Sequence, residues 1–176
     1  MVDRLPNFFI VGAPKCGTTS LAGWLAQHPN ILMSSAKEPH YYNTDFGNRH
    51  THSPAEYSRF FKHPPAVCDA VGEASVWYLY SHAAVPNILV DVPAAKFIVM
   101  LRNPVEMAPS LHEQQLVNGT EDVADFAAAW RLQTEREAGR SIPRLCEEPK
   151  LLLYGPACRL GEQLQRLYCV AGQEQV

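Results

Sequence analysis

The sequence predicts an α/β fold of three layers, in which helices cover both faces of a central parallel β-sheet. The first observation is a short apolar run, Phe8–Gly12, that passes through a Gly/Pro break into a helical segment ending near Gln27. The second is the segment Lys96–Leu101, apolar from Phe97 onwards, which is typical of a central strand buried on both sides. Two shorter runs, Ile31–Met33 and residues 66–73, add further strands between them.

Length and composition exclude several classes of protein. The 176 residues suffice for one domain with a hydrophobic core, and the net charge of −3 offers no general nucleic-acid surface. Asp3 and Pro6 interrupt the N-terminus, so we expect no signal peptide, and no apolar run approaches the roughly 20 residues of a membrane span. The five cysteines lack C-x-x-C pairing, which favours reduced thiols, no structural metal and a cytoplasmic location.

The loop after the first strand has the composition of an anion site. Gly17 allows close backbone approach, and the first N–H groups of the following helix lack partners inside the helix. A Walker A loop places Lys directly after its second Gly, whereas here Thr18 follows Gly17 and Lys15 precedes it. The bland alternative is a strand–helix turn that binds nothing.

Residues Pro14–Thr19, with the sequence P-K-C-G-T-T, fit the loop P-K-[SCGA]-G-T-[TS] of sulfotransferases that use 3′-phosphoadenosine 5′-phosphosulfate (PAPS). The chain therefore resembles the bacterial and carbohydrate-type members of that family, and the resemblance implies a P-loop-like fold. In the family this loop holds the 5′-phosphosulfate. The cofactor-binding residues so implied are Lys15, Cys16, Gly17, Thr18, Thr19 and Ser20.

A second motif follows the second predicted strand. Residues Lys37–Tyr42 read K-E-P-H-Y-Y and match the family's K-E-[PV]-H-[FY]-[FY]. The resemblance implies that Glu38 is the base that deprotonates the acceptor, with His40 as its support or its rival. The alternative is a surface turn that carries a charged pair.

The region between residues 43 and 66 is expected to form acceptor-side surface. Ser53 is a plausible N-cap, with Pro54 and Glu56 completing a capping box for a short helix to Phe61. Its three histidines lack the spacing of a metal motif. They are His50, His52 and His63.

Residues 72–79 match a third family pattern, G-E-[AK]-[ST]-P-x-Y-[LF], with Val76 in place of Pro. Ala74 stands where carbohydrate sulfotransferases often carry Lys, which leaves the acceptor class open. The aromatic side chains here either stack on an acceptor or pack in the core. They are Trp77, Tyr78 and Tyr80.

Arg102 directly follows the predicted strand at 96–101, and Ser110 lies eight residues later on the next helix. That spacing matches the family's second cofactor motif, so the resemblance implies that both bind the 3′-phosphate. A guanidinium fork matches phosphate oxygens in geometry. The alternative for Arg102 is a salt bridge that caps a helix or loop.

The remaining expectations concern helices and the end of the chain. We expect Trp24 in the core, a helix from Asp125 to Ala138, a solvated basic face that includes Arg136, and a last helix from Leu151 to about Val170. By the resemblance, residues 1–176 form a single sulfotransferase-like domain that lacks its last edge strand and the loop that closes over the nucleotide.

The implied reaction is sulfuryl transfer from PAPS, by in-line attack, to a hydroxyl or amine of a carbohydrate or small molecule. Lys15 would neutralise charge on the transferred group, and Glu38 would act as base, with no metal required. Two alternatives stay open. One is a P-loop kinase, and the other is a nucleotide-binding module without catalysis.

Overall fold

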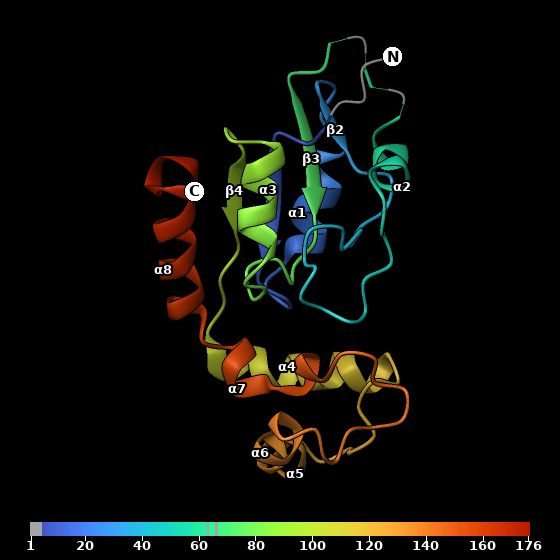
Figure 1. The fold of residues 1–176 in the computed structure, drawn as a ribbon, viewed down its shortest axis with the longest axis vertical. Coiled ribbons are helices and arrows are strands. Elements are labelled where there is room, and N and C mark those ends of the chain that lie inside the picture. Colours follow the sequence, from blue (N-terminus) through green and yellow to red (C-terminus); the bar gives the residue numbers. More distant parts are fainter. Residues whose placement is uncertain (1–4, 63, 66) are drawn as a thin grey trace.

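The computed structural model describes residues 5–62, 64–65 and 67–176 and contains a parallel four-stranded sheet (Figure 1). Three features of the sequence analysis lie outside the described residues, namely Asp3, the start of the strand predicted at 66–73, and His63. The strands are β1 (Phe8–Gly12), β2 (Ile31–Met33), β3 (Ala70–Ala74) and β4 (Lys96–Val99), in the order β2-β3-β1-β4. The predicted α/β class with a parallel sheet is confirmed.

One feature of the sheet differs from the sequence-based expectation. Among the described strands β4 pairs with β1 alone, so it forms an edge, whereas the sequence predicted a central strand. A run of apolar residues indicates burial by helices as well as by strands, and it does not reveal how many strand neighbours a segment has.

Alternate residues of β1 pack against opposite layers. Phe8 and Ile10 contact α1 (Thr18–Leu25) on one face, whereas Phe9 and Val11 belong to the main core on the other face, with α3 (Ala84–Asp91) and α8 (Leu160–Ala171). In Figure 1, α1 lies behind the sheet and α3 in front of it. The three layers follow from this alternation.

A long helix crosses the carboxyl ends of the strands. Figure 1 shows α4 (Pro104–Val117) running below the arrowheads of the sheet, with α7 (Tyr154–Ala157) beside it. Asn103 begins α4, because its side chain accepts a hydrogen bond from the Val105 N–H at 3.0 Å and Pro104 takes the first helical position. The helix thus covers the end of the sheet at which the strands finish and the loops after β1 and β3 begin.

The two helices predicted in the C-terminal half are each interrupted. The segment expected from Asp125 to Ala138 forms α5 (Phe126–Arg131) and α6 (Gln133–Glu137). The segment expected from Leu151 forms a 3₁₀ turn, α7 and α8 in succession, and a last 3₁₀ turn follows α8. Within the described residues the 3₁₀ helices are η1 (Arg59–Phe61), η2 (Pro149–Leu152) and η3 (Gln173–Gln175).

Two side chains lie opposite to expectation. Trp24 is 70% exposed, because Leu21, Ala22 and Leu25 form the face of α1 that covers the sheet. Arg136 is buried and donates to both carboxylate oxygens of Glu121 at 2.7 Å, instead of lying on a solvated face. The capping box at Ser53, by contrast, is formed as predicted, and it begins α2 (Pro54–Ser58).

Candidate functional site

The loop between β1 and α1 has a backbone that favours glycine at Gly17. Its φ is +82°, in the left-handed region, and it occupies the N-cap of α1 without a side-chain hydrogen bond to the helix. The first N–H groups of α1 are therefore not capped by Gly17. Lys15 also has a positive φ, +62°, and its Nζ donates to Gln114 Oε1 on α4 at 3.0 Å.

The segment that carries Glu38 and His40 is held against the end of β3. The Glu38 N–H donates to the Ala74 carbonyl at 2.9 Å, and Glu38 Oε2 accepts from the Val76 N–H at 2.9 Å. Lys37 Nζ contacts Glu38 Oε1, and His40 Nε2 lies 3.5 Å from Glu38 Oε2. The carboxylate is thus oriented by a backbone donor, a cation and an imidazole.

Left-handed backbone conformations concentrate at these positions. Four non-glycine residues of the described chain have a positive φ, and three of them are Lys15, Glu38 and His40, the fourth being Ser141. Such conformations cost on the order of 1–3 kcal/mol each, and they persist where the surroundings hold them.

One cavity of about 550 Å³ joins the two segments. It opens between the β1–α1 loop, the segment around Glu38 and the helix α4. Of the residues predicted from the sequence, the lining includes Lys15, Gly17, Thr18, Thr19, Glu38 and His40. The pairing of a phosphate-type loop with a candidate base in a single cavity is the arrangement that group transfer requires.

Four other predicted residues do not line this cavity. Arg102 lies beside the loop, with Nη1 donating to the Lys15 carbonyl at 3.4 Å and Nε 3.2 Å from Glu106 Oε2. Ser110 is half-buried on α4, and Ser20 is exposed on α1. Cys16 is buried, and burial raises the pKa of its thiol, so the site does not favour a thiolate.

Burial controls the charge of His40. The ring is almost completely enclosed, and this desolvation lowers the pKa of His40, although the neighbouring Glu38 carboxylate opposes the shift. The imidazole is therefore neutral at neutral pH, with its Nε2 beside the Glu38 carboxylate.

The opposite wall of the cavity contains residues that the sequence did not single out as a site. They come from the loop after Tyr42, from α4 and from η2, and they combine amides, an imidazole and an aliphatic chain. They are Asn48, His50, Gln114, Gln115, Asn118 and Leu151. Trp77, whose role the sequence left open, also lines the cavity, whereas Tyr78 and Tyr80 do not.

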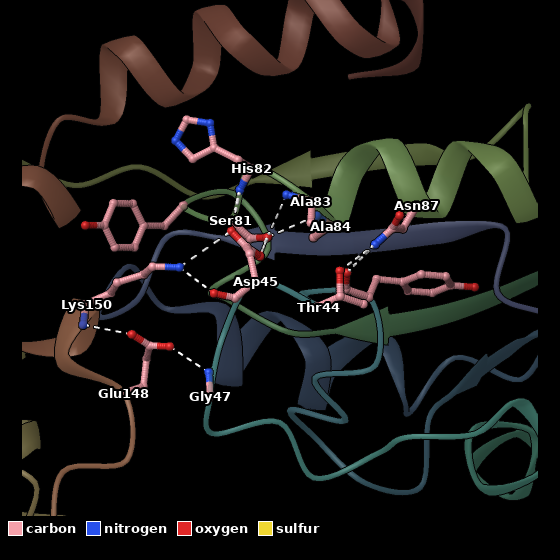
Figure 2. Close-up of polar contacts among 12 residues, drawn as sticks. Thr44, Asp45, Gly47, Ser81, His82, Ala83, Ala84, Asn87, Glu148 and Lys150 are labelled. Atoms are coloured by element: carbon pink, nitrogen blue, oxygen red, sulfur yellow. Dashed lines mark hydrogen bonds and ion pairs between the residues drawn. The ribbon is translucent and has the colours of Figure 1, made fainter.

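Long-range contacts hold the loop that carries Asn48 and His50 (Figure 2). The Asp45 carboxylate accepts from the Ser81 hydroxyl and, at 3.0 Å, from the His82 N–H, and Lys150 Nζ donates to the Asp45 carbonyl. Glu148 Oε2 accepts from the Gly47 N–H at 2.6 Å. No local pattern reveals this wall, because its anchors lie 36 to 105 residues away along the chain.

Comparison with known proteins identifies relatives of this architecture. The sequence model described as "Sulfotransferase family" matches residues 6–92. The crystal structure of a sulfotransferase from Alicyclobacillus acidocaldarius is 33% identical, with a TM-score of 0.86, over 98% of this chain and 72% of that one.

Curated proteins match over a shorter region. A bifunctional heparan sulfate N-deacetylase/N-sulfotransferase 3 of Mus musculus is 35% identical over 116 residues, and the membrane-associated sulfotransferase kil1 of Dictyostelium discoideum is 33% identical over 108 residues. These matches cover 64% and 60% of this chain but 13% and 22% of the relatives.

The expected cytoplasmic location is contradicted by these relatives, since one of them is a membrane-associated enzyme. In the described part of the chain, none of the helices has the length and apolar character needed to cross a membrane. The match to the bacterial enzyme over nearly the whole chain, together with the family match, leads to one conclusion: this chain belongs to the sulfotransferase family.

Proposed function

We propose that this chain transfers a sulfuryl group from PAPS to a hydroxyl or amine of a carbohydrate or small-molecule acceptor. The observation that supports it best is the single cavity that joins the Lys15 loop to Glu38 and His40. An anion-binding loop and an oriented carboxylate in one cavity supply the two things that sulfuryl transfer needs, namely charge stabilisation and a proton acceptor.

The donor-binding part of the proposal rests on the start of α1. Its backbone N–H groups, together with the hydroxyls of Thr18 and Thr19, would hold the 5′-phosphate, and Lys15 would neutralise the sulfuryl and bridging oxygens. Arg102 and Ser110 would bind the 3′-phosphate from outside the cavity, since Arg102 lies beside the Lys15 carbonyl. Cys16, Gly17 and Ser20 would complete the loop.

Glu38 is the proposed base, and His40 its positioning partner. As the acceptor oxygen or nitrogen bonds to sulfur, the bond from sulfur to the 5′-phosphate oxygen breaks and the acceptor proton passes to the Glu38 carboxylate. The Val76 N–H would hold the carboxylate during this step, with the neutral His40 ring beside it. Lys15 stabilises the charge that develops on the leaving oxygen.

The acceptor would enter beside Asn48, His50 and Trp77, opposite the loop. An aromatic face and neutral amides suit a sugar, and matched relatives include heparan sulfate N-sulfotransferases, which supports a carbohydrate amine or hydroxyl. A P-loop kinase is not favoured, because Thr18 stands where the Walker lysine belongs.

Calorimetry with 3′-phosphoadenosine 5′-phosphate tests the donor site. We expect binding by the wild type, much weaker binding by Lys15→Ala and Arg102→Ala, and no competition from ATP–Mg²⁺. Transfer of labelled sulfate from PAPS to a panel of amino sugars then tests the reaction, with Glu38→Gln as the variant that binds the nucleotide but does not turn over. Preference for ATP–Mg²⁺ would contradict the proposal, and binding without any transfer would support a non-catalytic module.

A further inference from the structure

The segment Lys37–Tyr42 contains no helix or strand, yet it carries the candidate base and its imidazole in left-handed conformations. The four backbone N–H groups of this segment that form hydrogen bonds all donate to one short stretch of chain, residues 74–78. The Tyr41 and Tyr42 carbonyls accept from the Arg49 and Asn87 side chains instead. The Ala74 carbonyl accepts from the Glu38 N–H, and the Ser75 hydroxyl accepts from the His40 N–H at 3.2 Å. The stretch at the end of β3 therefore acts as a template for the segment.

The last part of the template is a side chain that lies outside the cavity. Tyr78 is fully buried, and its hydroxyl oxygen accepts from the N–H groups of Tyr41 at 3.0 Å and Tyr42 at 3.2 Å. The same hydroxyl donates its hydrogen to Glu73 Oε2 at 3.0 Å. Both lone pairs of this phenol therefore accept from backbone amides of the segment after His40, and its proton is donated to Glu73.

Glu73 determines the direction in which the Tyr78 hydroxyl points. Its carboxylate is completely buried, and Oε2 accepts from Tyr57 at 2.8 Å as well as from Tyr78. With the hydrogen directed at Glu73, the lone pairs of the Tyr78 oxygen face the two backbone amides. Tyr57 donates to the same oxygen, and it touches the segment through ring stacking on Tyr41, at 4.4 Å between centroids.

We infer that Tyr78, aligned by Glu73, is a positioning residue that fixes the backbone behind Glu38 and His40 in its active geometry. The inference rests on the proposed role of Glu38 as base. Because catalysis depends steeply on the placement of the reacting groups, release of the Tyr41 and Tyr42 amides would lower turnover more than donor binding. The donor loop lies on β1 and α1, outside this hydrogen-bond set.

The test compares Tyr78→Phe with Tyr57→Phe. Each substitution keeps its ring and removes one hydrogen bond to Glu73, but only Tyr78→Phe also removes the acceptor of the two backbone amides. For Tyr78→Phe we expect exchange of the Tyr41 and Tyr42 amide hydrogens to accelerate roughly tenfold or more, kcat to fall about 10- to 100-fold, and the Kd of 3′-phosphoadenosine 5′-phosphate to stay unchanged. Tyr57→Phe should leave the exchange rates and kcat near wild type.

Unchanged exchange and kcat in folded Tyr78→Phe, or equal losses in both variants, would overturn the inference. If Tyr78→Phe does not fold, amide hydrogen exchange in the wild-type protein becomes the deciding measurement. The Tyr41 and Tyr42 amides must then be protected relative to that of Lys37, for which the described residues offer no acceptor. If wild type transfers no sulfate while these amides lose protection in Tyr78→Phe, the proposed reaction fails and the positioning contact stands.

Discussion

Lys15, Glu38 and His40 each place an L-amino acid in a backbone region that suits glycine. Sequence reasoning found all three through motif spacing, but it gave no indication of their conformation, because a positive φ at a non-glycine residue has no local signature. The conformations follow from tertiary contacts, such as the bond from Lys15 Nζ to Gln114 and the bond from the Glu38 N–H to Ala74. Strain of this kind is characteristic of functional sites.

A pair of substitutions at Lys15 measures that strain. Lys15→Gly and Lys15→Ala both remove the side chain, but only alanine keeps the cost of a left-handed conformation, so the glycine variant should be more stable by about 1 kcal/mol. Urea unfolding of both variants gives the difference. At Glu113, an exposed position in α4, the order should reverse by about 1 kcal/mol. An alanine variant as stable as the glycine variant at position 15 would show that the loop is not strained.

Glu73 should make stability depend on pH. Burial raises its pKa from the ordinary 4.5 to about 7, although hydroxyls of Ser75, Tyr57 and Tyr78 oppose the shift and Glu38 adds to it. The folded protein thus binds a proton that the unfolded chain releases above pH 4.5. The stabilisation is full below pH 4.5 and is lost as the pH rises through 7, by about 3 kcal/mol.

Unfolding free energies of wild type and Glu73→Gln between pH 4.5 and 8 test this expectation. Glutamine mimics the protonated acid. The free energy of unfolding of wild type relative to this variant should therefore fall by about 3 kcal/mol as the pH rises. Glu113→Gln, on the exposed side of α4, should show no such slope. A constant difference between wild type and Glu73→Gln would mean that the carboxylate is charged throughout.

Trp24 and Arg136 show where single residues escape prediction. Trp24 lies three positions after Leu21 and two after Ala22, so a small rotation of the helix decides whether it is inside or outside, and the actual face runs through Leu21, Ala22 and Leu25. Arg136 is buried by a partner 15 residues earlier, Glu121, which no helical period connects to it.

At the scale of elements, the ion pair of Arg136 and Glu121 joins α6 to the chain before α5, and the Tyr154 hydroxyl at the start of α7 donates to the same carboxylate at 2.7 Å. Removing one partner leaves the other charge buried, so Arg136→Met should destabilise the protein by about 3–5 kcal/mol in urea unfolding. The matched control is Arg140→Met, which breaks the exposed pair with Glu135 and should have no measurable effect. Similar losses in both variants would mean that the buried pair contributes nothing specific.

The elements that the sequence predicted well carry their signals locally. The capping box at Ser53, for example, is formed by residues within three positions of each other. The interruptions between α5 and α6 and between α7 and α8 were not predicted. They allow α6 to pack on η2, α7 on α4 and α8 on α3. These contacts are a demand of the tertiary fold and have no counterpart in the local periodicity.

At the scale of the whole molecule, ligand binding should stabilise the fold. The cavity is lined by the β1–α1 loop, the β2–β3 connection, α4 and η2. A ligand that contacts all four segments therefore binds the folded state and not the unfolded chain. At 100 times its Kd, 3′-phosphoadenosine 5′-phosphate should add about 2.7 kcal/mol, which raises Tm by roughly 5–10 °C. Calorimetric scans with adenosine 5′-phosphate as control check this, and no shift at saturation would contradict binding to the native state.

The global arrangement was predictable only in part. Parallel strands with polar loops at their carboxyl ends follow from the sequence, and the site does lie at that edge, since both Lys15 and Glu38 line the cavity there. The strand order, the edge position of β4 and the wall around Asn48 and Gln115 depend on pairings between distant segments, which one sequence does not display.

The anchor between Asp45 and Lys150 has a consequence for biosynthesis. The two residues are 105 positions apart, so at about 5–20 residues per second the ribosome takes roughly 5–20 s to add Lys150 after Asp45. All four strands are complete once Val99 has been added, about halfway through that interval, whereas the segment that fastens the acceptor wall is still missing. A nascent chain can therefore assemble its sheet and its donor loop well before the wall on the acceptor side is fastened.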